Sequence, residues 1–418
     1  MRSSDKESAL LPASEPPPPP DGGLQAWTQV FCMHMTFFNS WGVSNSFGVF
    51  QQFYSETLPQ SNSDLSWIGG VQVSLLFFVG VISSRLTDAG YFRPVYFLGV
   101  LFQLVGVFMT SLCKNYWQSF LAQGVCMGLG NGCTFCSGLT VMSSYFLRNR
   151  ALAVGVAAAG AAVGGLIFPV VVDRLLYEDA VGYPWTLRAV GFIMLATQIP
   201  CLLFFKPRLP PRRSGPLVDW SAFREMPFAF FTMSMFFNFW GLHFAFFYLG
   251  TFARDRIGMS RSDSLDLIMV INGVGIVGRI VPGMIGDRVT GMLNVLVPFS
   301  FAASLLTYCW AAIDSTAGLY VFAVVYGIIA AALQSLFPAT ATTMSPDMKK
   351  TGTRVGMIMT IVGAAALTGP SIQGALINRD DGRYLYGQLF SATSIMIGAL
   401  AGVACRVSKS GFVWQAKV

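Results

Sequence analysis

The feature of this sequence that most constrains its fold is a series of apolar stretches, each long enough to cross a membrane. A helix needs about 20 apolar residues to span the hydrocarbon core. Windows of that length predict an all-α membrane protein with twelve transmembrane helices. The expected spans lie near residues 25–50, 65–85, 93–112, 117–144, 151–172, 187–206, 227–251, 264–285, 292–313, 317–342, 355–377 and 385–405.

The composition agrees with a chain surrounded by the lipid bilayer. Of the 418 residues, 54% are hydrophobic and 11% are charged, whereas a soluble protein carries about 25% charged residues. Folding in water would leave too little polar surface to face the solvent. The net charge of +7 could suggest nucleic acid, but the distribution of the charges fits membrane orientation better, so no nucleic-acid partner is expected.

The Lys and Arg residues indicate how the chain is oriented. With both termini placed in the cytosol, 18 of the 27 fall in cytosolic segments and 8 in outside loops, and Arg279 lies within a span. Cytosolic loops of membrane proteins carry an excess of positive charge. The sequence therefore predicts cytosolic termini and an even number of spans. The plasma membrane is the expected location, because no retention signal is evident.

One short motif is written twice. Phe37–Gly42 reads FFNSWG and Phe236–Gly241 reads FFNFWG, 199 positions later. The same offset relates two further pairs, Asp88 with Asp287 and Gly128 with Gly327. Three matches at one offset indicate a duplicated unit of six spans. We therefore expect a disordered cytosolic tail, a six-helix bundle, a cytosolic linker, a second six-helix bundle and a cytosolic C-terminal tail, over residues 1–20, 21–206, 207–225, 226–405 and 406–418.

Two six-span halves of this kind resemble the architecture of the major facilitator superfamily. Gly283–Gly291 resembles the loop signature of that superfamily, G-x-x-x-D-R/K-x-G-R/K, and the loop after the second span keeps part of it. The resemblance implies that a substrate binds midway through the membrane, between halves that rock. It also implies that the two loops close the cytosolic side, through Asp88, Arg93, Asp287 and Arg288. The alternative is that these are ordinary solvated loop charges.

Two other stretches resemble the monocarboxylate-transporter family in the form that its fungal members show. Asp21–Trp27 (DGGLQAW) resembles [DE]-G-[GS]-[WF]-[GA]-W, with Leu24 in place of an aromatic residue. Tyr145–Gly160 resembles Y-F-x-[KR]-R-x-L-A-x-G-x-A-x-A-G, with the basic pair split into Arg148 and Arg150. These two arginines are expected at the membrane boundary, where they could exchange partners as the halves rock. The glycines that follow would give a smooth helix face that slides against a neighbour.

Arg279 is the sharpest candidate for a substrate contact. A charge in mid-membrane costs roughly 2.5–3.5 kcal/mol on insertion scales, so it is a functional candidate by default. The family resemblance implies that an arginine at this place holds the substrate carboxylate. Many family members also have an aspartate one turn earlier, where this chain has Gly275. A substrate anion would then be the counter-ion of Arg279, and a structural hydrogen bond is the alternative.

Further polar residues are candidates for the same cavity. Asn272 shares the predicted helix face of Arg279, and Asn45 falls at about the position of the family's span-1 lysine. Asn131 and Gln334 are added from spans 4 and 10, and His243 follows the second copy of the motif.

Two histidines and four aromatic residues complete the candidates. His34 and His243 are the side chains of the spans expected to titrate near neutral pH, so both are candidates for proton coupling, with plain hydrogen bonding as the alternative. An aromatic cavity for a larger planar acid would use Trp41, Trp240, Phe244 and Phe247.

The predicted function is secondary active transport of a small organic anion, a monocarboxylate or related acid, by alternating access. The alternatives are an efflux carrier for a fungal secondary metabolite and a transporter-like nutrient sensor. The spans carry no metal-ligand cluster, no catalytic constellation and no phosphate-binding loop, so neither an enzyme nor a cofactor is expected. The lipid bilayer and an organic anion are the expected partners, with protons as a further candidate. Substrate identity, direction of transport and oligomeric state stay open.

Overall fold

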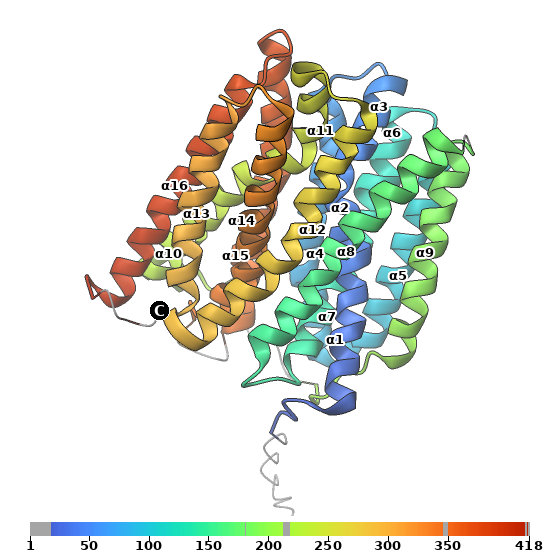
Figure 1. Ribbon diagram of the computed structural model, residues 1–418. Coiled ribbons are helices and arrows are strands. Elements are labelled where there is room, and N and C mark those ends of the chain that lie inside the picture. Colours follow the sequence, from blue (N-terminus) through green and yellow to red (C-terminus); the bar gives the residue numbers. More distant parts are fainter. Residues whose placement is uncertain (1–17, 180, 212–217, 346–349, 414–415, 417–418) are drawn as a thin grey trace, which may run out of the picture.

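The computed structural model describes residues 18–179, 181–211, 218–345, 350–413 and 416, and the side chain of Asp287 lies outside the described part. Figure 1 shows long helices that run side by side along one direction. Helices from the first part of the chain, in blue to green, lie on one side, and most of those from the second part, in yellow to red, lie on the other.

The helical elements follow the expected spans. Before the linker they are α1 (Gly23–Phe37), η1 (Phe38–Gly42), α2 (Val43–Asn45), α3 (Phe47–Thr57), α4 (Asn62–Leu86), η2 (Thr87–Tyr91), α5 (Phe92–Thr110), α6 (Tyr116–Ser119), η3 (Phe120–Cys126), α7 (Met127–Ser143), α8 (Arg150–Asp173), η4 (Arg174–Glu178) and α9 (Tyr183–Phe204). From the linker onward they are η5 (Trp220–Arg224), α10 (Met226–Leu242), α11 (Phe244–Ile257), α12 (Arg261–Ile285), η6 (Gly286–Thr290), α13 (Met292–Trp310), α14 (Thr316–Thr342), α15 (Thr351–Arg379) and α16 (Leu385–Ser410).

The predicted all-α membrane fold is confirmed. Within the described ranges, ten continuous helices are long and apolar enough to cross a membrane. One of them, Asn62–Thr110, is 49 residues long and contains both the second and the third expected span, which are separated at Gly90 by a backbone φ of 96°. The first expected span is divided among α1, η1, α2 and α3 and is not one of the ten. The number of twelve spans and the domain limits stay predictions.

The internal repeat is visible in the packing as well as in the sequence. A Cβ atom added to Gly128 would lie 3.1 Å from Cα of Gln72, and one added to Gly327 would lie 3.0 Å from Cα of Ile271. Gln72 and Ile271 are themselves 199 positions apart. The π-helical turns η2 and η6 also begin and end at positions related by this offset. The duplication therefore extends to helix contacts and to backbone irregularities.

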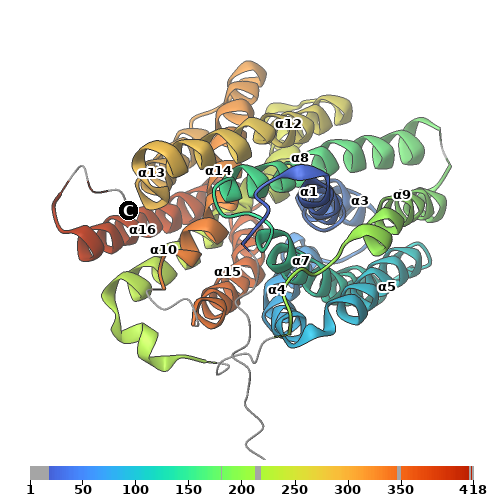
Figure 2. The same cartoon turned by 90° about the horizontal axis from the view of Figure 1, so that it is seen from below.

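The two halves meet where α8 lies against α12 and where α4 lies against α15 (Figure 2). Helix α8 also packs on α1 of its own half. A Cβ atom on Gly160 would overlap the backbone oxygen of His34 in α1, and one on Gly165 would lie 2.5 Å from Cγ of Asn272 in α12. The smooth face expected for this helix thus lets α8 approach a neighbour in each half.

We expect Gly160→Ala to destabilise the protein, because the new methyl group would meet the backbone of α1 rather than a movable side chain. Overpacking of this kind should lower Tm by on the order of 5 °C in a thermal-shift measurement on the purified protein. Gly283→Ala in α12 is the control, because nothing lies within 4 Å of its added Cβ. Equal effects of the two substitutions would contradict the close contact between α8 and α1.

Candidate functional site

A cavity lies between the two halves and is lined from both of them. Its volume is about 20 Å³, which is room for about one water molecule. A larger ligand therefore requires the halves to move apart. The lining residues are Phe37, Trp41, Phe77, Phe135, Leu139, Val154, Ala158, Ala161, Phe239, Arg279, Gln334, Ser335, Phe337 and Pro338.

Arg279 of α12 brings a charge into this cavity. Its side chain is buried, and its Nη2 donates a hydrogen bond of 2.9 Å to Oε1 of Gln334 in α14. No Asp or Glu is among the lining residues. The sequence predicted both residues as substrate contacts, and the structure brings them together. Among the described residues, the guanidinium charge is hydrogen-bonded to an amide dipole, and an anion would complement it much better.

Gly275 provides the space for the guanidinium. A Cβ atom at this position would lie 2.7 Å from Nη1 of Arg279. The aspartate that the family resemblance leads one to expect here would therefore occupy the place of the arginine head group. With glycine at this position, the guanidinium has room, and residue 275 supplies no carboxylate to pair with it.

Aromatic rings form most of the cavity wall. Trp41 packs on Phe77 with ring centroids 5.5 Å apart, Phe77 on Phe239 at 6.0 Å, and Phe239 on Phe337 at 5.2 Å. The first two residues belong to the first half and the others to the second. These contacts make a continuous aromatic wall across the interface between the halves.

The aromatic cavity predicted from the sequence is correct for one residue of four. Trp41 lines it, whereas Trp240, Phe244 and Phe247 are not among the lining residues. Nε1 of Trp240 donates a hydrogen bond of 2.9 Å to Oγ1 of Thr368 in α15, within the second half. Sequence reasoning missed Phe37 and Phe239, although both belong to the repeated motif.

The two histidines lie in different surroundings. Nδ1 of His34 donates to the backbone oxygen of Val156 at 2.8 Å, which joins α1 to α8. His243 is buried between α10 and α11, and neither of its ring nitrogens has a hydrogen-bond partner in the described part of the chain. Its ring stacks on Trp41, with centroids 6.4 Å apart and an interplanar angle of 11°. His243 therefore contacts the cavity residue Trp41 but does not itself line the cavity.

The three predicted asparagines are buried but do not line the cavity. Asn272 donates to the backbone of Ile268 at 2.9 Å. Oδ1 of Asn131 accepts from Nε2 of Gln103 at 2.8 Å, inside the first half. Asn45 ends α2, and its amide nitrogen has no acceptor among the described residues. Their role as substrate contacts stays a prediction.

The sequence model of the Major Facilitator Superfamily matches residues 32–370. The match covers well over half of the chain and includes every residue that lines the cavity. The chain belongs to the major facilitator superfamily. It is accordingly an integral multi-pass membrane protein, and membership in a family of transporters supports the expectation that it is not an enzyme.

The relatives are fungal transporters. The chain is 41% identical to an MFS-type transporter of Gibberella zeae, over 98% of this chain and 92% of the relative. It is 35% identical to the aspyridones efflux protein apdF of Emericella nidulans, over 98% and 84%. It is 33% identical to the agnestins efflux protein AgnL12 of Paecilomyces divaricatus, over 91% and 87%. These names do not mention monocarboxylates, so the narrower family resemblance stays a prediction.

The superfamily's loop residues lie where the repeat predicts. Asp88 is in η2, Arg93 is near the start of α5, and Asp287 and Arg288 are in η6. The side chains of Arg93 and Arg288 are exposed, and that of Asp287 lies outside the described part. Their role in closing one side of this transporter stays a prediction.

The two motifs that resemble the monocarboxylate-transporter family contact one another. Oδ1 of Asp21 accepts from the backbone N–H groups of Leu147 and Arg148, and the backbone N–H of Asp21 donates to Tyr145 at 3.1 Å. The Leu147 hydrogen bond is the main reason why the pKa of Asp21 lies below its ordinary value. These bonds fasten the start of α1 to the entrance of α8. The Arg148 and Arg150 side chains are exposed at the same place.

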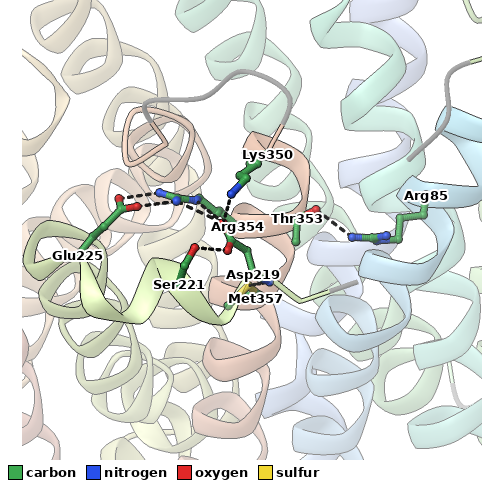
Figure 3. A network of polar contacts seen from close by, with 8 residues as sticks. All are labelled: Arg85, Asp219, Ser221, Glu225, Lys350, Thr353, Arg354 and Met357. Atoms are coloured by element: carbon green, nitrogen blue, oxygen red, sulfur yellow. Dashed lines mark hydrogen bonds and ion pairs between the residues drawn. The ribbon is translucent and has the colours of Figure 1, made fainter. Parts of the chain in front are cut away.

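An ionic network fastens the linker to α15 (Figure 3). Arg354 donates to both carboxylate oxygens of Glu225, at 2.7 and 2.6 Å, and its Nε lies 3.3 Å from Oδ2 of Asp219. Nζ of Lys350 lies 3.4 Å from the same Asp219 oxygen.

Close by, Nη2 of Arg85 in α4 donates to Oγ1 of Thr353 at 2.9 Å, which joins the two halves. We call this end of the bundle the linker end.

The opposite end is held by a carboxylate that two arginines share. Glu56 of α3 lies 3.0 Å from Nη1 of Arg254 in α11 and 2.8 Å from Nη2 of Arg261 in α12. The Arg261 guanidinium also lies over the Tyr177 ring, 3.4 Å from its centroid. Because Glu56 and Tyr177 belong to the first half and both arginines to the second, these contacts must break whenever this end opens.

We expect Arg354→Gln to lower Tm by on the order of 5 °C near neutral pH, since both linker carboxylates lose their shared donor. Ser221 and Lys350 with Arg354 hold the pKa of Asp219 below its ordinary value, and Arg354 does so for Glu225. A lowered pKa contributes stability above the ordinary carboxyl range, and that stability is lost as the pH falls through the lowered values.

The difference in Tm between wild type and Arg354→Gln should therefore be constant from about pH 8 to about pH 5, shrink below about pH 4, and be lost only once the pH lies below the lowered pKa values of Asp219 and Glu225. Arg224→Gln, which removes an exposed neighbouring arginine, is the control and should leave Tm unchanged. A difference that persists undiminished into acid would contradict the ionic network.

We expect Glu56→Gln to loosen the end of the bundle opposite the linker. Loss of a partly exposed ion pair should raise hydrogen exchange of the α3 and α11 backbone roughly two- to fivefold. Hydrogen–deuterium exchange with mass spectrometry measures this. Asp255→Asn is the matched control, because Asp255 accepts from Tyr384 at 2.7 Å within one half. The same exchange in both variants would refute a contact specific to the interface between the halves.

Proposed function

We propose that this chain exports a negatively charged organic metabolite by alternating access between its two halves. The observation that carries the proposal is Arg279, a buried cation in an aromatic cavity between the halves, bonded to the neutral Gln334. An anionic substrate would supply the opposite charge that the described lining lacks. Binding would then be strongest while the substrate is enclosed, where water does not screen the charge.

The direction of transport is taken from the relatives. Two of them are named as efflux proteins, for aspyridones and for agnestins. This favours efflux of a fungal secondary metabolite over the uptake of a small monocarboxylate. The aromatic wall supports the same choice, because the rings of Trp41, Phe77, Phe239 and Phe337 stack better on an aromatic metabolite than on a short aliphatic acid.

The two ends of the bundle suggest how export would proceed. In the orientation that the positive charges predict, the linker end faces the cytosol of a cell whose plasma membrane holds the protein. Opening at Arg85 and Thr353 would load the substrate, and opening at Glu56 would release it. Protons are the proposed coupling ion, with His243 as their carrier, because the described residues offer its ring nitrogens no hydrogen-bond partner, so the unprotonated nitrogen could take a proton when Trp41 moves. His34 is the weaker candidate, since its Nδ1 is engaged.

We expect Arg279→Gln to reduce transport of anionic aromatic metabolites by about ten- to a hundredfold, which corresponds to one charged hydrogen-bonded contact. Flux of a labelled panel of aromatic and aliphatic acids into inside-out vesicles, with and without a pH gradient, measures it. Arg256→Gln, an exposed arginine, is the control. Wild-type flux through Arg279→Gln would overturn the anion site, and flux that ignores the pH gradient would overturn proton coupling.

A further inference from the structure

The two tryptophans of the repeated motif differ in a way that the repeat does not require. Trp41 and Trp240 are 199 positions apart. Nε1 of Trp240 donates to Thr368 at 2.9 Å, inside its own half. Trp41 lines the cavity with 6% of its surface exposed, and none of the described residues accepts from its Nε1. One copy of the motif therefore has its indole N–H bonded within the fold, and the other does not.

The backbone differs at the same place. Trp41 lies in the π-helical turn η1, whereas Trp240 lies in the regular helix α10. A π-helical turn inside a longer helix is rare and occurs frequently at functional sites. The His243 ring stacks nearly parallel to Trp41 from the second half, so it helps to fix the plane of the indole. The position of Trp41 is thus set by contacts from both halves.

The side-chain atoms of the cavity that lack a partner in the described ranges, Nε1 of Trp41 and Nε2 of Gln334, are donors. Arg279 can only donate, and its partner Gln334 has an amide nitrogen with no acceptor in the described ranges. Trp41 can also only donate. The Ser335 hydroxyl already donates to the backbone oxygen of Ala332 at 3.2 Å, so it adds no further donor. A buried donor without a partner is unfavourable, so a ligand that brings acceptors would bind well here.

The shape of the cavity adds a second requirement. Phe77, Phe239 and Phe337 present rings from both halves, and aromatic rings stack well on flat ligands. The donors come from both halves, with Trp41 in the first half and Arg279 and Gln334 in the second. A flat ligand with acceptors at two ends would therefore contact both halves at once.

We propose that the substrate is a planar aromatic oxyanion with a second acceptor oxygen on its ring system, and that Trp41 donates a hydrogen bond to this oxygen. The charged end binds Arg279 and Gln334. This inference rests on the proposed function, because it assumes that the cavity is the transport site. It adds a specificity-determining residue, Trp41, and a substrate class narrower than an organic anion.

The test measures binding of 2-naphthoate and its mono-methoxy derivatives to the purified full-length protein by calorimetry. A methoxy oxygen accepts hydrogen bonds but cannot donate them. We expect at least one derivative to bind wild type about three- to tenfold more tightly than 2-naphthoate, the gain of one hydrogen bond. Trp41→Phe keeps a ring in place but removes the N–H donor, so it should abolish this preference, and the methoxy derivatives should bind that variant no more tightly than 2-naphthoate does.

Trp240→Phe is the matched control and should keep the preference, because Trp240 bonds Thr368 instead of lining the cavity. The inference is overturned if wild type binds none of these probes, if it shows no preference, or if Trp41→Phe retains the preference.

Arg279→Gln separates the two proposals. Undiminished binding of 2-naphthoate to that variant would refute the anion site, and a preference still erased by Trp41→Phe would then uphold the role of Trp41.

Discussion

Helices in a bilayer gain little free energy by burying apolar surface against each other, because the lipid is equally apolar. The distance between their backbones therefore determines how they pack. Here that distance is set along α8, which touches α1 at Gly160 and α12 at Gly155 and Gly165. The contact brings Arg279 of the second half up to the aromatic wall of the first. The cavity depends on this approach, because Val154, Ala158 and Ala161 of α8 line it together with Arg279.

Much of the fold could be predicted because the bilayer imposes a length and a polarity on each span. The last expected span began at residue 385, where α16 also begins. The first was expected to end near residue 50, yet α3 continues to Thr57. The polar residues of this continuation suggest the end of a span in the sequence. In the structure, however, Gln51 is buried and donates to Ser66 at 3.1 Å. Hydropathy does not reveal a polar residue whose partner lies in another helix.

The site was predictable only where a residue type is rare in a membrane. Arg279 could be identified alone, but its pairing with Gln334 required the positions of two helices. The sequence does not distinguish the cavity residues Phe135 and Phe337 from phenylalanines that face lipid, since both environments are apolar. The Glu56 contacts join residues about two hundred positions apart, and no local pattern indicates them.

The π-helical turns record an order of events. A gene duplication copies backbone irregularities together with the sequence that encodes them. The turns η2 and η6 occupy equivalent positions in both halves, so the ancestral six-helix unit already had this turn. The turn η1 at Trp41 has no counterpart around Trp240 in α10, so the two copies diverged there after the duplication. The turn that both halves share is thus older than the difference around their tryptophans, and one copy could change there while the other kept a regular helix.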